Sequence, residues 1–308
     1  MQKRGKTASG KQRWLCRLCK SSSLKTRGDT KQYFFKRDFI TWLLGNSSLN
    51  ELSSTKGVSR RTLIRHFGEF WKYIPQPVTK PPPNNYVLIC DGVYIYKRLC
   101  CVLIAKTKTA VVTWLFVTYE YGETWLLLFR TLKQPTAVVC DGQKGLLLAI
   151  RTLWPTTKIQ KCLAHVMRSE QIYLTKNPKT RPGKALLQLI KALPNVWTRR
   201  QKRRWLHAYF RLLHKYSSFL KERTYFRSTT GILHWWYTHR GVRSAYYLIK
   251  HNVCYLFTYI GHYDIPRTSN HVEGGINSRL KELLHRHRGL SVDKKKVLVS
   301  YFLLSKQH

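Results

Sequence analysis

Two short segments of the chain place an aspartate directly after a run of apolar residues. The first reads Val-Leu-Ile-Cys-Asp-Gly and ends at Asp91-Gly92, and the second reads Ala-Val-Val-Cys-Asp-Gly and ends at Asp141-Gly142. Asp-Gly is common turn chemistry, which explains either segment alone. It explains less well why both follow the same apolar-Cys pattern in a chain that has only 14 acidic residues.

The two aspartates suit a metal site if their strands are neighbours in one sheet. Functional side chains of open α/β sheets gather at the carboxyl ends of the strands. Two carboxylates that close repel each other unless a cation lies between them. Because carboxylate oxygens are hard ligands, Asp91 and Asp141 are interpreted as ligands of Mg²⁺ or Mn²⁺.

A third candidate carboxylate, Glu273, lies near the end of the chain. Asn270, Glu273, Asn277 and Lys281 are spaced three or four residues apart, so they share one face of a helix. Such a stripe can present a metal ligand together with donors for phosphate. The alternative is local, because Asn270 at the N-cap and Glu273 at N3 resemble a capping box. That alternative leaves Asn277 unexplained.

The elements that must position these residues follow from the apolar patterns. Three β-rich runs predict an antiparallel meander: 86–96, 99–107 and 110–119. Helix-like and strand-like segments then alternate: 124–132, 136–140, 144–153 and 158–163. A basic, helical stretch over about 166–263 precedes a final helix over 268–287. Together these predict a mixed α/β sheet with a long helical insertion.

The first 85 residues predict a separate DNA-binding part. Residues 31–73 read as helices, with a capping box at Ser48 and a left-handed turn at Gly57 between two short helices. This spacing is typical of a helix-turn-helix domain, in which Arg60, Arg61 and Arg65 are free to meet DNA. An ordinary basic helical hairpin is the alternative.

Residues 1–30 read as loops and contain Cys16-Arg-Leu-Cys19. A CxxC pair is half of a tetrahedral zinc site, so we interpret this stretch as a partial zinc-ribbon-like segment whose zinc binding stays open. The Pro-rich segment 74–85 cannot be a helix or a central strand, and it predicts a linker between the DNA-binding part and a domain spanning 86–308.

Charge indicates the partner. The chain has 56 Lys and Arg against 14 Asp and Glu, a formal net charge of +42. Such self-repulsion favours a protein bound to a polyanion, with nucleic acid the obvious one. No apolar run is long enough to span a bilayer, and four cysteines lie in apolar strands. We therefore expect a cytoplasmic, nucleoid-associated protein with no membrane partner.

In their order along the chain, these motifs resemble bacterial insertion-sequence transposases of the mutator-like superfamily, in the branch with a zinc-binding amino terminus. The resemblance implies an RNase H-like fold whose first and fourth strands are adjacent. It also implies that Asp91, Asp141 and Glu273 form a DDE triad holding two Mg²⁺ or Mn²⁺ ions. Cys162 and His165 match the family's C-x-x-H element beside the catalytic site. Taken alone, they are equally a strand-end cysteine and a helix-start histidine.

The resulting prediction is a transposase that cleaves and joins DNA by two-metal phosphoryl transfer. Its partners would be the ends of its element and the target DNA, and we expect a homo-oligomer on DNA. Two other functions compete. One is a helix-turn-helix regulator whose RNase H-like part is an inactive scaffold. The other is a basic RNA-binding protein, which leaves Asp91 and Asp141 unexplained.

Overall fold

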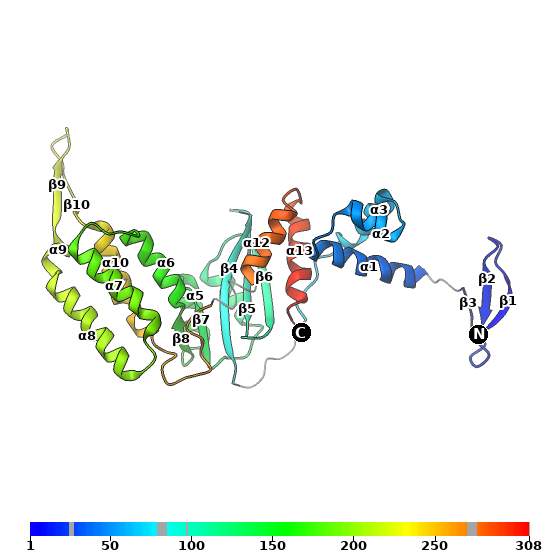
Figure 1. The fold of residues 1–308 in the computed structure, drawn as a ribbon, viewed down its shortest axis with the longest axis horizontal. Coiled ribbons are helices and arrows are strands. Elements are labelled where there is room, and N and C mark those ends of the chain that lie inside the picture. Colours follow the sequence, from blue (N-terminus) through cyan, green and yellow to red (C-terminus); the bar gives the residue numbers. More distant parts are fainter. Residues whose placement is uncertain (25–27, 79–84, 97, 270–275, 308) are drawn as a thin grey trace. The chain divides into compact units, whose positions relative to one another are not determined.

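The computed structural model describes residues 1–24, 28–78, 85–96, 98–269 and 276–307. The chain divides into two compact units (Figure 1). The first contains Met1–Gln76 and Arg286–Ser305, and the second contains Pro77–His285 and Lys306–His308. The boundary between Gln76 and Pro77 falls inside the Pro-rich segment 74–85.

The first unit begins with a small antiparallel sheet of three strands, β1 (Gln2–Lys6), β2 (Gln12–Leu15) and β3 (Ser22–Leu24). The expectation of loops over residues 1–30 was therefore wrong for these segments. Gly10 adopts a left-handed φ of 76° in the turn between β1 and β2. All five residues of β1 are exposed, so the strand carries no buried apolar alternation that a sequence pattern could reveal.

Helices make up the rest of the first unit: α1 (Gly28–Leu44), α2 (Leu49–Lys56), α3 (Arg60–Phe70) and α13 (Val292–Leu304). Aromatic rings fill the space between α1, α3 and α13. The Phe39 ring contacts both Phe67 and Tyr301, with centroids 5.2 and 5.7 Å apart. The final turns of the chain are thus part of the core of the first unit.

The pair α2–α3 has the predicted caps. Ser48 Oγ accepts from the Glu51 N–H at 3.2 Å, and the Glu51 carboxylate accepts from the Ser48 N–H at 2.8 Å. Gly57 ends α2 at a φ of 61°, and Ser59 Oγ accepts from the Thr62 N–H at the start of α3. Leu63 and Phe67 form the buried face of α3, whereas Ile64 is 49% exposed.

The second unit is built on a mixed five-stranded sheet. In spatial order the strands are β6 (Val111–Val117), β5 (Cys100–Lys106), β4 (Val87–Tyr96), β7 (Ala137–Cys140) and β8 (Lys158–Lys161). Strands β4, β5 and β6 form the predicted antiparallel meander, and β4, β7 and β8 run parallel. The first and fourth strands of this unit are therefore adjacent.

Two helices, α4 (Gly122–Phe129) and α5 (Lys144–Leu153), pack on one face of the sheet. Alternate residues of β4 and β7, including Cys90 and Cys140, point into this core with Trp125. The two helices start very close together, as shown by the distance of 2.7 Å that a Cβ on Gly145 would have to the Gly122 backbone N. The absence of side chains at both glycines permits this approach.

The insertion after β8 consists of helices interrupted by a hairpin. The elements are α6 (Leu163–Leu174), α7 (Arg181–Ala192), η1 (Leu193–Asn195), α8 (Arg199–Lys215), α9 (Ser217–Lys221), β9 (Arg223–Arg227), β10 (Leu233–Tyr237), α10 (Arg240–Asn252) and η2 (Val253–Tyr255). The expectation of an all-helical insertion was wrong at β9–β10. Both strands are rich in aromatic residues, which favour strands, and Gly231 adopts a φ of 80° between them.

The predicted final helix over 268–287 is described only in part. Helix α12 spans Ser278–Arg286, whereas residues 270–275 lie outside the described residues. None of the helices in the described ranges is both long and apolar enough to cross a bilayer.

Candidate active site

The two Asp-Gly motifs lie side by side because their strands pair in register. In the parallel pair β4–β7, Val87, Leu88 and Ile89 face Ala137, Val138 and Val139. Asp91 and Asp141 each lie two residues further along their strands, so they occupy equivalent positions. Neighbouring strands are about 4.8 Å apart. Since side chains alternate along a strand, the Asp91 carboxylate leaves the sheet on the face opposite the core that contains Cys90.

Asn277 brings the end of the second unit to this edge of the sheet. Its Nδ2 donates to Asp91 Oδ2 at 2.5 Å, across 186 residues of sequence. Its Oδ1 is buried and accepts no hydrogen bond from any described residue. Asp91 is itself only 9% exposed. Of the predicted helical stripe, Asn277 thus contacts Asp91. Asn270 and Glu273, the other members of that stripe, lie outside the described residues.

Cys162 and Ser269 connect the start of α6 to the segment that leads toward Asn270. The Cys162 thiol accepts from both the N–H and the hydroxyl of Ser269, each at 3.2 Å. The Leu163 N–H donates to Arg267 O at 3.0 Å. Burial acts to raise the pKa of the Cys162 thiol, but hydrogen bonds with His165 and Ser269 bring this pKa below its usual value. Cys162 thus anchors the segment that ends at Ser269, shortly before the predicted third carboxylate.

Glu120 is a third acid near the two aspartates that sequence reasoning missed. It precedes α4, and its carboxylate fills the space that a side chain at Gly92 would need: a Cβ there would lie 2.5 Å from Glu120 Oε2. Trp125 Nε1 donates to Glu120 Oε1 at 3.1 Å. Burial, followed by the charge of Asp141 and a smaller effect of Asp91, raises the pKa of Glu120 to about 7. The one sequence signal that could have pointed to Glu120 is the rarity of acidic residues in this chain.

Lys161 is a buried cation beside Asp141 that sequence reasoning also missed. It ends β8, and its alkyl chain crosses the backbone of Gly142, where a Cβ would lie 2.5 Å from Lys161 Cε. Gly142 has a φ of 83°, which a glycine adopts without strain. Lys161 Nζ donates to Asn252 Oδ1 at 3.0 Å. Burial lowers the pKa of this ammonium group, and the nearby Cys140 and Asp141 oppose that shift.

The donor atoms at this edge fit a hard divalent cation. The carboxylates of Asp91 and Asp141 and the amide oxygen of Asn277 are all oxygen ligands, and the buried amide oxygen has an unused acceptor position. Within the described ranges, no three His, Cys, Asp or Glu side chains are arranged to hold a metal ion. Glu273, the predicted third carboxylate, lies outside those ranges.

The other predicted functional residues lie at the surface. Lys281 is exposed on α12. Arg60, Arg61 and Arg65 are all exposed on α3, and Arg61 and Arg65 lie opposite its buried face. Glu282, a second acid of α12, forms an ion pair with Arg279 at 2.7 Å.

Cys16 and Cys19 follow β2 in a turn. The Cys19 thiol lies 2.9 Å from Ser21 Oγ. Hydrogen bonds with Ser21 and then Cys16 lower the pKa of Cys19 to about 7. A thiol with that pKa is about half ionised near neutral pH, and the thiolate is the form that binds zinc. Two thiols are half of the four ligands that a structural zinc site needs.

Comparison with known proteins gives one family. No curated protein matches the chain. The family described as "Transposase, Mutator family" matches residues 104–233. This stretch runs from β5 to the start of β10 and contains Glu120, Asp141, Cys162 and His165, but neither Asp91 nor Glu273. It covers less than half of the chain, and over it the protein is similar to transposases of the Mutator family.

Proposed function

We propose that the protein is a DDE transposase with an RNase H-like catalytic unit, which cleaves DNA at the ends of its element and joins them to a target. The observation that carries the proposal is the equivalent placement of Asp91 and Asp141 on adjacent parallel strands, with Asn277 donating to Asp91. The Mutator-family match over residues 104–233 supports the same conclusion.

In this proposal Asp91, Asp141 and Glu273 would hold two Mg²⁺ or Mn²⁺ ions. Bound there, such ions would supply activation of a water or 3′-hydroxyl nucleophile and stabilisation of the leaving oxygen. Asn277 fixes the orientation of the Asp91 carboxylate, and Cys162 anchors the segment before Glu273. Lys161 places a positive charge beside Asp141, where phosphate oxygens would approach. No protein nucleophile is needed.

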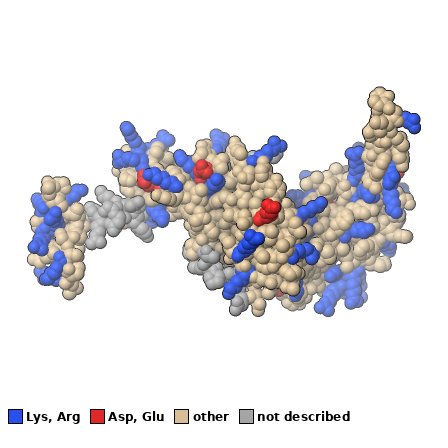
Figure 2. All heavy atoms as spheres, turned by 180° about the vertical axis from the view of Figure 1, so that it is seen from behind, with Lys and Arg blue, Asp and Glu red and all other residues tan. Residues whose placement is uncertain are grey.

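The basic surfaces would bind the DNA. Helix α3 exposes three arginines and belongs to a helix pair with helix-turn-helix caps, so we assign it to the major groove at the element ends. Residues 151–262 contain 22 Lys and Arg against two acids, Glu170 and Glu222. Figure 2 shows Lys and Arg side chains along the hairpin β9–β10 and the helices beside it.

The decisive experiment is incubation of the full chain with Mg²⁺ and DNA fragments that carry the sequences flanking its coding region. We expect strand cleavage by the wild type, none by Asp91→Asn or Asp141→Asn, and DNA affinity within about two-fold of wild type for both variants. The carboxylates hold metal, whereas other residues hold phosphate. Cleavage by either variant at the wild-type rate would contradict the proposal.

The competing function is a helix-turn-helix regulator, and the α2–α3 pair favours it as much as it favours a transposase. Replacing Arg60, Arg61 and Arg65 by alanine separates DNA recognition from catalysis. Loss of each base-contacting arginine costs about 1–3 kcal/mol of binding and relaxes specificity. A footprint that the triple variant leaves unchanged would exclude α3 as the recognition helix. Binding without cleavage in the wild type would favour the regulator.

A further inference from the structure

The hairpin β9–β10 and helix α10 share a continuous stack of rings and guanidinium groups. Trp235 and Tyr237 lie two residues apart on β10, so they share a face, and Arg223 pairs with Tyr237 across the hairpin. The Arg223 guanidinium lies 4.1 Å from the Trp235 ring centroid and 5.8 Å from that of Tyr237. Arg243 of α10 lies 3.6 Å from Tyr237 and 4.4 Å from Tyr247. We call these five residues the insertion stack.

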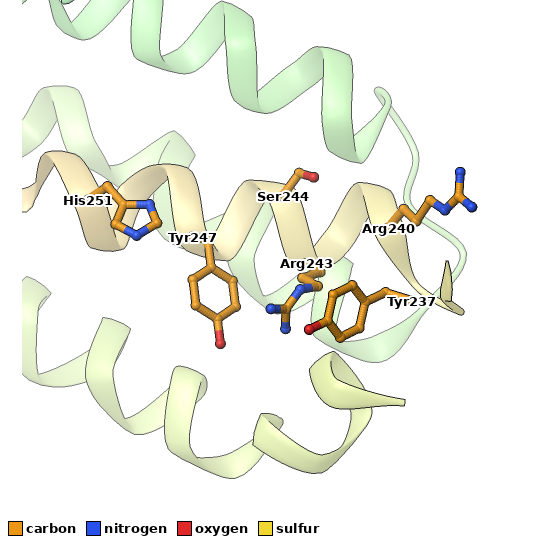
Figure 3. A pocket seen from close by; sticks show the side chains of 6 residues that line it. All are labelled: Tyr237, Arg240, Arg243, Ser244, Tyr247 and His251. Carbon is orange, nitrogen blue, oxygen red and sulfur yellow. The ribbon is translucent and has the colours of Figure 1, made fainter. Parts of the chain in front are cut away.

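A cavity of about 370 Å³ opens beside the insertion stack. It is lined by Tyr237, Arg240, Arg243, Ser244, Tyr247 and His251. Except for Tyr237, these residues lie on one face of α10, and Figure 3 shows the Arg243 side chain between the rings of Tyr237 and Tyr247. Two arginines, a histidine and two aromatic rings thus surround a space that no acidic side chain lines.

The two arginines of the cavity have different partners. Arg243 Nη1 donates to Leu220 O at 2.9 Å, and its guanidinium is held between two rings, so its position is fixed. Arg240 is exposed at the end of the cavity, with its guanidinium 5.6 Å from the Trp236 ring. Arg243 therefore orders the rings, and Arg240 can meet an anion from solvent.

The hairpin also exposes apolar surface that its own fold does not cover. Tyr225, Phe226, Leu233 and Trp235 are each between 47% and 56% exposed. The neighbouring acid, Glu222, is paired with His239 at 3.1 Å. Exposed aromatic rings that alternate with cations fit a ligand with flat apolar faces and regularly spaced negative charges. Single-stranded nucleic acid has this chemistry, because its unpaired bases stack on rings and its phosphates pair with arginine.

We infer that the insertion stack and its cavity bind a single-stranded stretch of DNA, with bases on the rings of Trp235 and Tyr247 and a phosphate at Arg240. The inference rests on the proposed function, in which strand cleavage exposes unpaired DNA. An acidic peptide would satisfy the arginines but leave the rings uncovered. Duplex DNA would offer phosphates but no base faces.

The test is fluorescence anisotropy of a labelled twelve-nucleotide thymidine oligomer with the full chain, without divalent ions and at physiological salt. Because stacking contributes roughly 1–3 kcal/mol per base, Trp235→Leu should raise the Kd about ten-fold to a hundred-fold. Arg240→Gln should raise it several-fold, and Tyr247→Phe, which keeps the ring, should leave it unchanged. A twelve-base-pair duplex should bind all of these variants like the wild type.

Arg200→Gln is the matched control, since Arg200 is exposed on α8 and its loss changes the net charge as Arg240→Gln does. An equal effect of these two substitutions would mean that charge alone is sensed and would overturn the inference. Wild-type binding by Trp235→Leu would overturn it as well. So would displacement of the oligomer by polyglutamate at equal charge, because that result favours an acidic peptide.

The outcome is independent of the cleavage reaction. Asp91→Asn should bind the thymidine oligomer as the wild type does, because Asp91 belongs to the sheet edge and not to the insertion stack. Oligomer binding without any cleavage would count against the proposed transposase alone. Cleavage that persists while the oligomer fails to bind would count against the insertion stack alone.

Discussion

Glu120 keeps its proton to a higher pH than an ordinary glutamate does. Its carboxyl group is packed against Gly92 and Trp125, and burial, with Asp141 second, raises its pKa from 4.5 to about 7. The folded state therefore retains a proton that the unfolded state has already released. The contribution of Glu120 to stability is full below about pH 4.5, falls as the pH rises toward 7, and stays low above that.

Glu120→Gln tests how the raised pKa of Glu120 affects stability. The amide oxygen can still accept from Trp125 Nε1, while the buried charge is gone. We expect the melting temperature of the metal-free variant to match wild type at pH 5 and to exceed it at pH 8. Losing a negative charge beside Asp141 should also raise the Mg²⁺ concentration needed for half-maximal cleavage. If variant and wild type have equal melting temperatures at both pH values, ionisation of Glu120 does not destabilise the folded protein.

Glu273→Gln separates a metal ligand from a helix cap. Gln serves in a capping box as well as Glu does, because its amide oxygen accepts the same N–H. A divalent cation needs the charge that Gln lacks. We expect an unchanged melting temperature and unchanged DNA binding, with Mg²⁺-dependent cleavage lost. Full activity would mean that another acid supplies the third ligand. Glu120 would then be tested before Glu282, because Glu282 is paired with Arg279.

At the scale of the element, Cys162 joins the start of α6 to the segment that precedes Asn270. Cys162→Ala leaves the N–H and the hydroxyl of Ser269, a residue 1% exposed, without their acceptor. A buried donor left unsatisfied costs about 1–3 kcal/mol, and urea unfolding measures that loss. We also expect cleavage to fall, because the tether positions the next segment. Cys162→Ser keeps a hydrogen-bond acceptor for Ser269, so it should restore both stability and cleavage. Equal losses in the Ala and Ser variants would show that the hydrogen bonds to Ser269 do not have this role.

The sequence predicted the elements whose signals are local or periodic. The meander, helix α5, the capping box at Ser48 and the turn at Gly57 are confirmed, because buried alternation and capping geometry depend on neighbours along the chain. The hairpin β9–β10 was missed because the charge of its surroundings masked the aromatic content of its strands. The exposed strand β1 gave no apolar signal.

The candidate site residues that the sequence singled out are those that repeat a motif or share a helical spacing. Asp91 and Asp141 end two copies of one pattern, and the pairing of β4 with β7 brings them together. Asn277 was singled out by its helical spacing, and the structure places it against Asp91. Glu120 and Lys161 could not be found in that way, since each reaches the sheet edge through three-dimensional contacts with a glycine, Gly92 or Gly142, far from it in sequence.

At the scale of the whole molecule, the division of the chain into two units has a consequence for dissecting it. The polypeptide leaves the first unit after Gln76, returns at Arg286 and leaves again after Ser305. A truncated protein that starts at residue 77 would therefore carry α13 without α1, its packing partner. The aromatic face of α13 would then be exposed, and such a fragment should aggregate.

Severing the backbone once should therefore not release a free DNA-binding fragment. With a specific protease site inserted between residues 78 and 85, the two products of complete cleavage should co-elute under native conditions and separate only in denaturant. The contact between Phe39 of α1 and Tyr301 of α13, and the hydrogen bond between His287 and Leu43 O at 3.0 Å, hold the amino-terminal piece to the carboxyl-terminal one. Tyr301→Ala should weaken the association of the two fragments. Separation of the wild-type fragments under native conditions would contradict the prediction. These contacts predict that the two fragments stay associated without a covalent link between them.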